Sequence, residues 1–106
     1  MARTTKKSIM VGGEEFILSL DMNILCDIEE HFGRSVESVF TDKERLGIKV
    51  VRDLIYLTAR RLHRDITPEH IGSLMETNEM PDYFDTLSDL ITTFGGEPKN
   101  DQQAEG

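Results

Sequence analysis

Two consecutive glycines, Gly12 and Gly13, separate two short runs in which apolar and polar residues alternate. Ile9 and Val11 alternate before the glycines, and the alternating apolar residues after them are Phe16, Leu18 and Leu20. Alternation with period two indicates β-strands, and glycine supplies the positive φ angles of a tight turn. The sequence therefore predicts a β-hairpin over residues 8–20. Because a lone hairpin is only marginally stable in water, we expect it to pack on the elements that follow.

The first of these elements is a helix from Asp21, an expected N-cap, to Phe32. Gly33 can adopt the left-handed conformation that ends it. Its apolar stripe is predicted to contain Met22, Leu25, Cys26, Ile28 and Phe32. A short turn over residues 35–40 follows, with the inward-facing side chains Val36, Val39 and Phe40.

The longest helix is predicted over residues 43–63. Thr41 and Glu44 have the Thr-x-x-Glu spacing of a capping box, in which side chains satisfy the first free amides of a helix. The apolar positions cover much of the circumference and comprise Leu46, Val50, Val51, Leu54, Ile55, Leu57 and Leu62. A helix with so wide an apolar surface is expected to be central in the fold.

Two more helices are predicted in the last third of the chain. Thr67-Pro68 has an N-cap followed by proline at the first helical position, and this helix should run to Met75. Pro81-Asp82 opens the last helix, which Gly95-Gly96 ends. Its predicted apolar face is Phe84, Leu87, Leu90, Ile91 and Phe94, and its polar face is Asp82, Asp85 and Asp89.

These elements together predict an α+β fold, in which an N-terminal hairpin packs on four to five helices. The chain has 106 residues, which fits one domain. We expect a disordered arm at residues 1–7, a single globular domain at residues 8–96 and a disordered tail at residues 97–106, because polar termini have little to bury. A small core and an open hairpin edge make self-association, as a homo-oligomer, an expected property.

Composition excludes several classes of protein. Hydrophobic residues make up 38% and charged residues 30%, as in water-soluble domains. No charge-free stretch approaches the roughly 18–20 residues that span a bilayer, and no apolar core of a secretory signal follows the basic N-terminus. The only cysteine, Cys26, has no partner for an internal disulfide. We therefore expect no membrane association and a reducing, cytoplasmic location.

Charge is distributed unevenly along the chain. The net charge is −8, and residues 1–41, 42–64 and 65–106 carry net charges of −3, +4 and −9. The predicted partner-binding residues are the cations of the middle block that could form one ridge: Lys49, Arg52, Arg60, Arg61 and Arg64. Three interpretations remain open: neutralisation by aspartates of the acidic last third, an acidic protein partner, or nucleic acid. An acidic chain is repelled by phosphate, and no aromatic residues for base stacking lie among these cations, so nucleic acid is not expected.

Motifs for catalysis, cofactors or metals are not found in the sequence. His31, His63 and His70 lack the i, i+4 spacing of helical metal sites and are interpreted as solvated surface residues. Cys26 has no sign of activation and is interpreted as a buried core residue. The glycine pair lacks the lysine and the spacing of a phosphate loop. We therefore expect neither enzymatic activity nor a cofactor.

Four stretches in order resemble the tail assembly chaperones of long-tailed bacteriophages and their relatives in prophages and gene-transfer agents. They are the hairpin segment 13–20, the Ile28-Glu29-Glu30 to Gly33-Arg34-Ser35 segment within 25–35, the long-helix segment 50–65 with its His63-Arg64-Asp65 exit, and the Thr67-Pro68 helix opening within 66–74. Their order and spacing carry the resemblance, which covers residues 8–96.

The resemblance implies a non-enzymatic role in the bacterial host cytoplasm. Such chaperones bind the tape-measure protein, a very long helical chain, and keep it soluble until tail-tube subunits polymerise around it. The tail-tube protein is a second expected partner, and the chaperone is absent from the finished particle. Some relatives also have a longer form made by translational frameshifting, to which residues 95–106 could serve as a linker. Met10, Met22, Met75 and Met80 could be adaptable contact residues, or core filler.

Two alternatives to a chaperone remain open. The first is another phage structural or adaptor subunit, such as a tail completion protein, which would be present in the finished particle. The second is a small nucleic-acid-binding regulator that uses the region around Arg60–Arg64. Its duplex binding would weaken steeply with added salt.

Overall fold

The structure is a computed structural model that describes residues 4–42, 44 and 46–95. Its elements follow in the order β1 (Thr5–Val11), β2 (Glu14–Leu20), α1 (Met22–Phe32), α2 (Val36–Thr41), α3 (Ile48–Ala59), α4 (Pro68–Leu74), the 3-10 helix η2 (Thr77–Glu79) and α5 (Met80–Gly95). The arrangement is an N-terminal hairpin followed by five α-helices. The predicted α+β fold is therefore confirmed.

The hairpin is an antiparallel pair of strands joined by a two-residue turn. Val11 pairs with Glu14, which leaves Gly12 and Gly13 in the turn with φ angles of 58° and 89°. Two successive positive φ angles are typical of a type I′ turn. Strand β1 begins three residues before the predicted domain boundary, because Thr5 to Lys7 pair with β2. Residues 1–3 of the predicted arm and the whole predicted tail lie outside the described residues.

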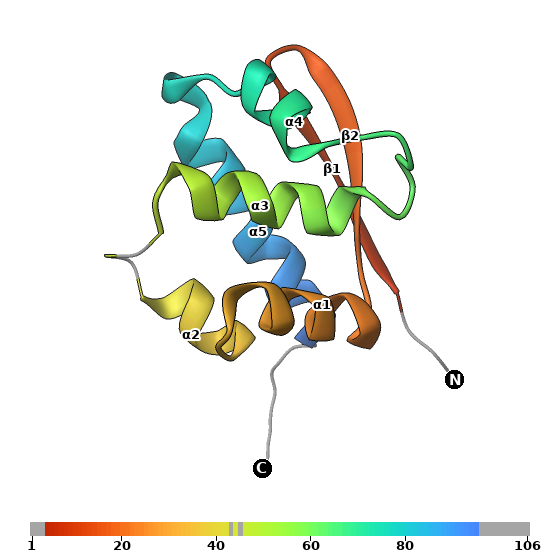
Figure 1. Ribbon diagram of the computed structural model, residues 1–106, viewed down its shortest axis with the longest axis vertical. Helices are drawn as coiled ribbons and strands as arrows, with labels where there is room; N and C mark the ends of the chain where they lie inside the picture. The colour runs from red at the N-terminus through yellow and green to blue at the C-terminus, as the bar shows by residue number, and fades with distance from the viewer. Residues whose placement is uncertain (1–3, 43, 45, 96–106) are drawn as a thin grey trace.

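Helix α3 lies across the middle of the molecule, between α4 on one side and α1 with α2 on the other (Figure 1). Strand β2 contacts α3, and strand β1 contacts α5. The hairpin therefore packs on these two helices, as its marginal stability requires. The buried apolar core lies between them and comprises Ile9, Val11, Phe16, Leu18, Leu20, Ile24, Ile28, Val39, Val51, Leu54, Ile55, Leu57, Ala59, Ile71, Tyr83, Leu87 and Leu90.

Several helix ends follow their local sequence signals. Asp21 caps α1, since its Oδ1 accepts a 3.0 Å hydrogen bond from the backbone N–H of Ile24. Gly33 ends α1 in the left-handed conformation, with φ of 69°. Thr67 caps α4 through a 3.1 Å hydrogen bond that its hydroxyl accepts from the N–H of His70. These side chains satisfy amides that have no partner inside the helix.

Helix α3 is much shorter than the predicted helix over residues 43–63, whose first residue lies outside the described part of the chain. Thr41 is the last residue of α2, and its hydroxyl donates to the carbonyl oxygen of Glu37 at 2.9 Å. An N-cap needs an extended backbone, so this threonine cannot open the next helix. Gly47 takes that position without a side-chain hydrogen bond. The segment predicted as a short turn is instead helix α2.

Helix α5 begins one residue before the predicted Pro81 and ends at Gly95, while Gly96 lies outside the described residues. Its predicted acidic face is exposed. The side chains that it buries most deeply are Tyr83, Leu87 and Leu90. Tyr83 was not among the predicted core residues. The predicted Phe84, Ile91 and Phe94 are half-buried.

Candidate functional site

Lys49 and Arg52, two of the predicted partner-binding residues, bind a carboxylate of their own helix. Asp53 is buried and accepts hydrogen bonds from Lys49 Nζ at 2.9 Å and Arg52 Nε at 3.0 Å. His31 Nε2 of α1 donates to the same carboxylate at 3.0 Å. Burial alone raises the pKa of Asp53, but the hydrogen bonds from these three residues outweigh it, so the pKa lies below its ordinary value of 3.8.

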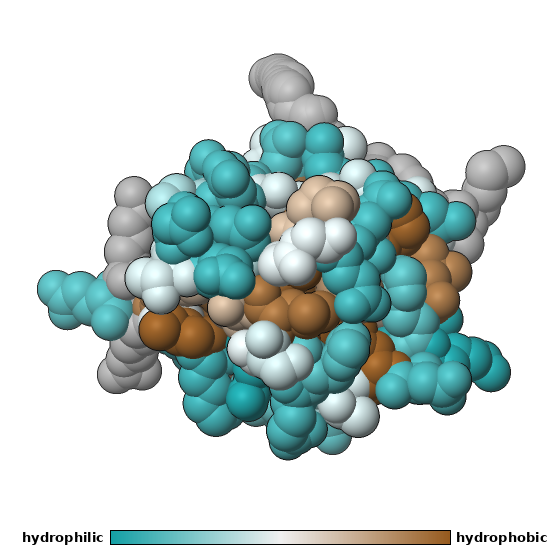
Figure 2. Space-filling model, turned by 90° about the horizontal axis from the view of Figure 1, so that it is seen from above, coloured by the Kyte–Doolittle hydropathy of each residue, from teal (hydrophilic) through white to brown (hydrophobic). Residues whose placement is uncertain are grey.

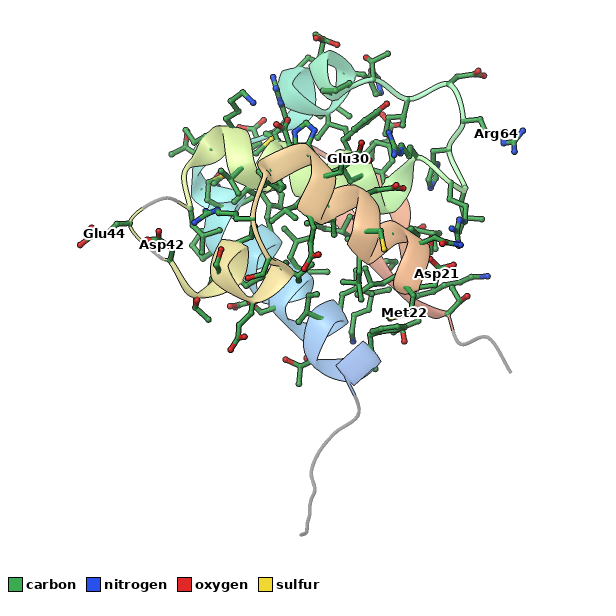
Figure 3. All side chains as sticks on the ribbon, turned by 60° about the horizontal axis from the view of Figure 1, so that its bottom comes forward. Asp21, Met22, Glu30, Asp42, Glu44 and Arg64 are labelled. Carbon is green, nitrogen blue, oxygen red and sulfur yellow. The ribbon has the colours of Figure 1, made fainter. Side chains whose placement is uncertain are left out.

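The three arginines beyond the C-terminal end of α3 differ in their surroundings. Arg60 binds Asp27 at 3.2 Å, and Arg61 binds both carboxylate oxygens of Asp21. The hydrogen bond from Arg61 lowers the pKa of Asp21 below its ordinary value. Arg64 is exposed, projects from the loop after α3 (Figure 3) and forms no ion pair with any described residue.

The five cations of the predicted ridge do not all border one hollow. Lys49 and Arg52 border a hollow with Met75 of the α4 C-cap, whereas the three arginines border a separate hollow at the other end of α3. Neutralisation within the chain occurs through Asp21, Asp27 and Asp53, and no described aspartate of residues 65–95 forms an ion pair with these cations. Of those later aspartates, Asp89 pairs with Lys7 of β1 at 3.0 Å.

His31 and His70 are exposed, as predicted, whereas His63 is half-buried, and all three histidines contact other residues. His63 Nε2 accepts a 2.9 Å hydrogen bond from the N–H of Ile17 on strand β2, and its ring meets Phe16 edge-on with centroids 5.3 Å apart. His70 lies 3.4 Å from the carboxylate of Glu14. His63 thus connects the hairpin to the loop after α3, and His70 connects it to α4. Among the described residues, no group of three or more His, Cys, Asp or Glu side chains could hold a metal ion.

A largely apolar groove is formed by α1, α2 and the last turns of α5, with a volume of about 500 Å³. We call it the α1–α2–α5 groove. Its apolar lining residues are Met22, Leu25, Cys26, Val36, Phe40, Ile91 and Phe94. Met22 is 67% exposed and stands at the N-terminal end of α1, labelled in Figure 3. An open apolar groove between helices suits an apolar partner surface.

The charged residues among the described lining of the groove are all acidic. Glu29 and Glu37 line it, and none of those residues is basic. Glu29 also has a structural role, because its Oε2 accepts a 2.9 Å hydrogen bond from the N–H of Val36 at the start of α2. Glu37 is exposed, so its carboxylate remains available to a ligand.

Cys26 is exposed in this groove, so its predicted burial in the core is wrong. Helix α1 has two apolar faces: Ile24 and Ile28 pack in the core, while Met22, Leu25 and Cys26 face the groove. The prediction placed both sets on one stripe and omitted Ile24. The signal that could have revealed the groove is this excess of apolar residues, which is more than one buried face needs.

The end of the molecule that carries α4 has a different surface. It is mostly hydrophilic, with apolar residues across the middle of the view and in a further patch towards its right side (Figure 2). Of the methionines considered as contact residues, Met10 and Met22 are exposed, whereas Met75 and Met80 are half-buried. No helix among the described residues is long and apolar enough to cross a membrane.

The chain matches no protein-family model, no curated protein and no solved structure.

Proposed function

We propose that this chain is a non-enzymatic tail assembly chaperone of a long-tailed bacteriophage or a related prophage or gene-transfer agent. It binds the tape-measure protein in the bacterial cytoplasm, with the tail-tube protein as a second partner, and leaves before the particle is finished. The observation that carries this proposal is the α1–α2–α5 groove. A client that is a long helical chain presents apolar helix faces, and a helix lying in an apolar groove is a common mode of recognition.

The contacts of the basic residues favour a protein client over nucleic acid. Arg60 and Arg61 are engaged by Asp27 and Asp21, and Lys49 and Arg52 by Asp53. Binding phosphate through these four residues would compete with those ion pairs. The net charge of −8 adds long-range repulsion of a polyanion.

The test is co-expression of the tagged chain with the long, helix-rich protein encoded beside it. We expect that protein to precipitate alone and to become soluble, and to co-purify, when the chain is present. Met22→Ser should reduce the co-purified amount several-fold, because a buried methionine contributes about 1.5–3 kcal/mol. Ile48→Ser is the matched control. Ile48 is also the first residue of its helix and is similarly exposed, at 63% against 67%, but it lies outside the groove.

Three outcomes would count against a chaperone. The neighbouring protein could be soluble without the chain and fail to co-purify with it. The chain could be found in finished particles, which would favour a tail completion protein. It could bind DNA duplexes with a steep salt dependence, which would favour a regulator.

A further inference from the structure

We propose that the α1–α2–α5 groove selects an amphipathic helix in which the apolar stripe is bordered by lysine or arginine. This inference rests on the proposed function, since it names the kind of client segment that the chaperone would hold. It follows from the lining of the groove, from its charge, and from the poor fit of the other available occupants.

The apolar lining sets the shape of the ligand. Leu25 and Cys26 of α1, Phe40 of α2, and Ile91 and Phe94 of α5 come from three helices and leave an open trough. Side chains at positions i, i+3, i+4 and i+7 of a helix project from one face over about 10 Å. Such a stripe fills a trough of about 500 Å³ with two or three large side chains, while the rest of the helix remains in solvent.

The charge at the groove sets the flanks of the ligand. Glu29 and Glu37 lie at the groove, and no described lining residue is basic. Gly95, the last described residue of α5, also lines the groove, and the last turn of α5 contains no basic residue. The C-terminal end of a helix carries a partial negative charge, so it favours a cation as well. A helix with lysine or arginine beside its apolar stripe therefore matches the groove, whereas one with glutamate is repelled.

Two other occupants fit less well. A second copy that used the same groove would bring Glu29 and Glu37 of both copies to one interface, where like charges repel. The chain beyond Gly95 is not a suitable ligand either. Its sequence from residue 96 to 106 contains no large apolar side chain and only one basic residue against three acidic ones.

The experiment measures the binding of two synthetic peptides to the full-length chain by fluorescence anisotropy. Each peptide is an amphipathic helix of about 20 residues, long enough to be helical in water, with a leucine stripe. One has lysine at every flanking position, and the other has glutamate. We expect the lysine peptide to bind about tenfold or more tightly than the glutamate peptide, and this ratio to shrink as salt screens the charges.

Glu37→Lys is the variant that locates the charge preference. Glu37 is the second residue of α2, is exposed and lines the groove. Its matched control is Glu69→Lys, because Glu69 is the exposed second residue of α4 and lies outside the groove. We expect Glu37→Lys to weaken binding of the lysine peptide about three- to tenfold, as expected for removing an attraction and adding a repulsion. Glu69→Lys should leave it within a factor of two.

Equal binding of the two peptides, or equal effects of the two variants, would overturn the inference. So would a dimer in light scattering that Met22→Ser abolishes, because a second copy would then occupy the groove. Failure of this inference is separable from failure of the proposed function. If the tape-measure protein co-purifies and Glu37→Lys retains all of it, only the charge preference fails. If the lysine peptide binds but no tape-measure protein co-purifies, only the chaperone assignment fails.

Discussion

The phenolic hydroxyl of Tyr83 donates a 2.6 Å hydrogen bond to Oε1 of Glu79, four residues earlier in the chain. The same carboxylate oxygen accepts the backbone N–H of Gly12 in the hairpin turn at 3.1 Å. The Tyr83 hydroxyl also accepts the N–H of Glu76 at 3.0 Å. The buried Tyr83 thus links α5 to the segment before it, which contains η2. Glu79 of this segment is in turn bound to the hairpin turn.

Tyr83→Phe should lower the free energy of unfolding by about 1–2 kcal/mol, since it removes a donor and leaves the N–H of Glu76 without its acceptor. Urea unfolding followed by circular dichroism measures this change. In a Glu79→Ala background the cost of Tyr83→Phe should be smaller, because one of its two hydrogen bonds is already absent. An equal cost in both backgrounds would mean that the two side chains are not coupled.

The same hydroxyl should resist ionisation. Burial, together with the hydrogen bond to Glu79, raises the pKa of Tyr83 from 10.0 to about 12. A raised pKa in the folded state means that this contribution to stability is complete below pH 10 and is lost as pH rises towards 12. The chain has two tyrosines, so Tyr56→Phe leaves Tyr83 as the only one. Its tyrosinate absorbance should appear near pH 12, and an ordinary midpoint near 10 would contradict the buried hydrogen bond.

Gly12 and Gly13 offer a matched pair of substitutions in the hairpin turn. Both have positive φ angles, which cost an L-residue about 1–2 kcal/mol. A Cβ at Gly12 would also stand 2.1 Å from the carbonyl oxygen of Leu74, whereas one at Gly13 would have no atom within 4 Å. Gly12→Ala should therefore be several kcal/mol less stable than the parent, and Gly13→Ala only about 1–2 kcal/mol. Equal losses in urea unfolding would show that α4 does not approach the turn.

The lowered pKa of Asp53 predicts a loss of stability in acid. Because its folded pKa lies below the unfolded value of about 3.8, its contribution is present above that value and is lost as pH falls through the folded pKa. Asp53→Asn should cost about 1–3 kcal/mol at neutral pH, since His31, Lys49 and Arg52 lose a charged acceptor.

Urea midpoints at neutral pH and through the acid range measure this contribution. The difference between parent and Asp53→Asn should shrink as pH falls below 4. Glu44→Gln is the control, because Glu44 is exposed and projects into solvent (Figure 3). A difference that stays constant with pH would mean that Asp53 is not the titrating group.

Local signals allowed much of the fold to be predicted. Asp21, Gly33 and Thr67 act through hydrogen bonds and backbone angles within a few residues of themselves, so their roles as helix ends could be predicted without the tertiary structure. The hairpin turn could also be predicted locally, because it is formed by the adjacent residues Gly12 and Gly13. The spacing of Thr41 and Glu44 also resembled a cap, but α2 already uses this threonine as its last residue.

Contacts between distant residues could not be predicted in this way. Asp53 is bound by His31, which lies 22 residues away in the sequence. Helical periodicity predicts Cys26 in the core because it identifies an apolar residue but not the surface that the residue meets. The groove exists because α5 packs near α1 and α2, and no local sequence pattern predicts that packing.

The most direct test of the proposed client binding at the α1–α2–α5 groove uses Cys26, the only cysteine of the chain, which is exposed in the groove. The measurement is the rate of its alkylation in the free chain and in the complex purified with the tape-measure protein. If the client helix lies in the α1–α2–α5 groove, alkylation should slow about tenfold or more in the complex and recover when the complex dissociates. An unchanged rate in a stable complex would show that the client binds elsewhere and would contradict the assignment of the groove.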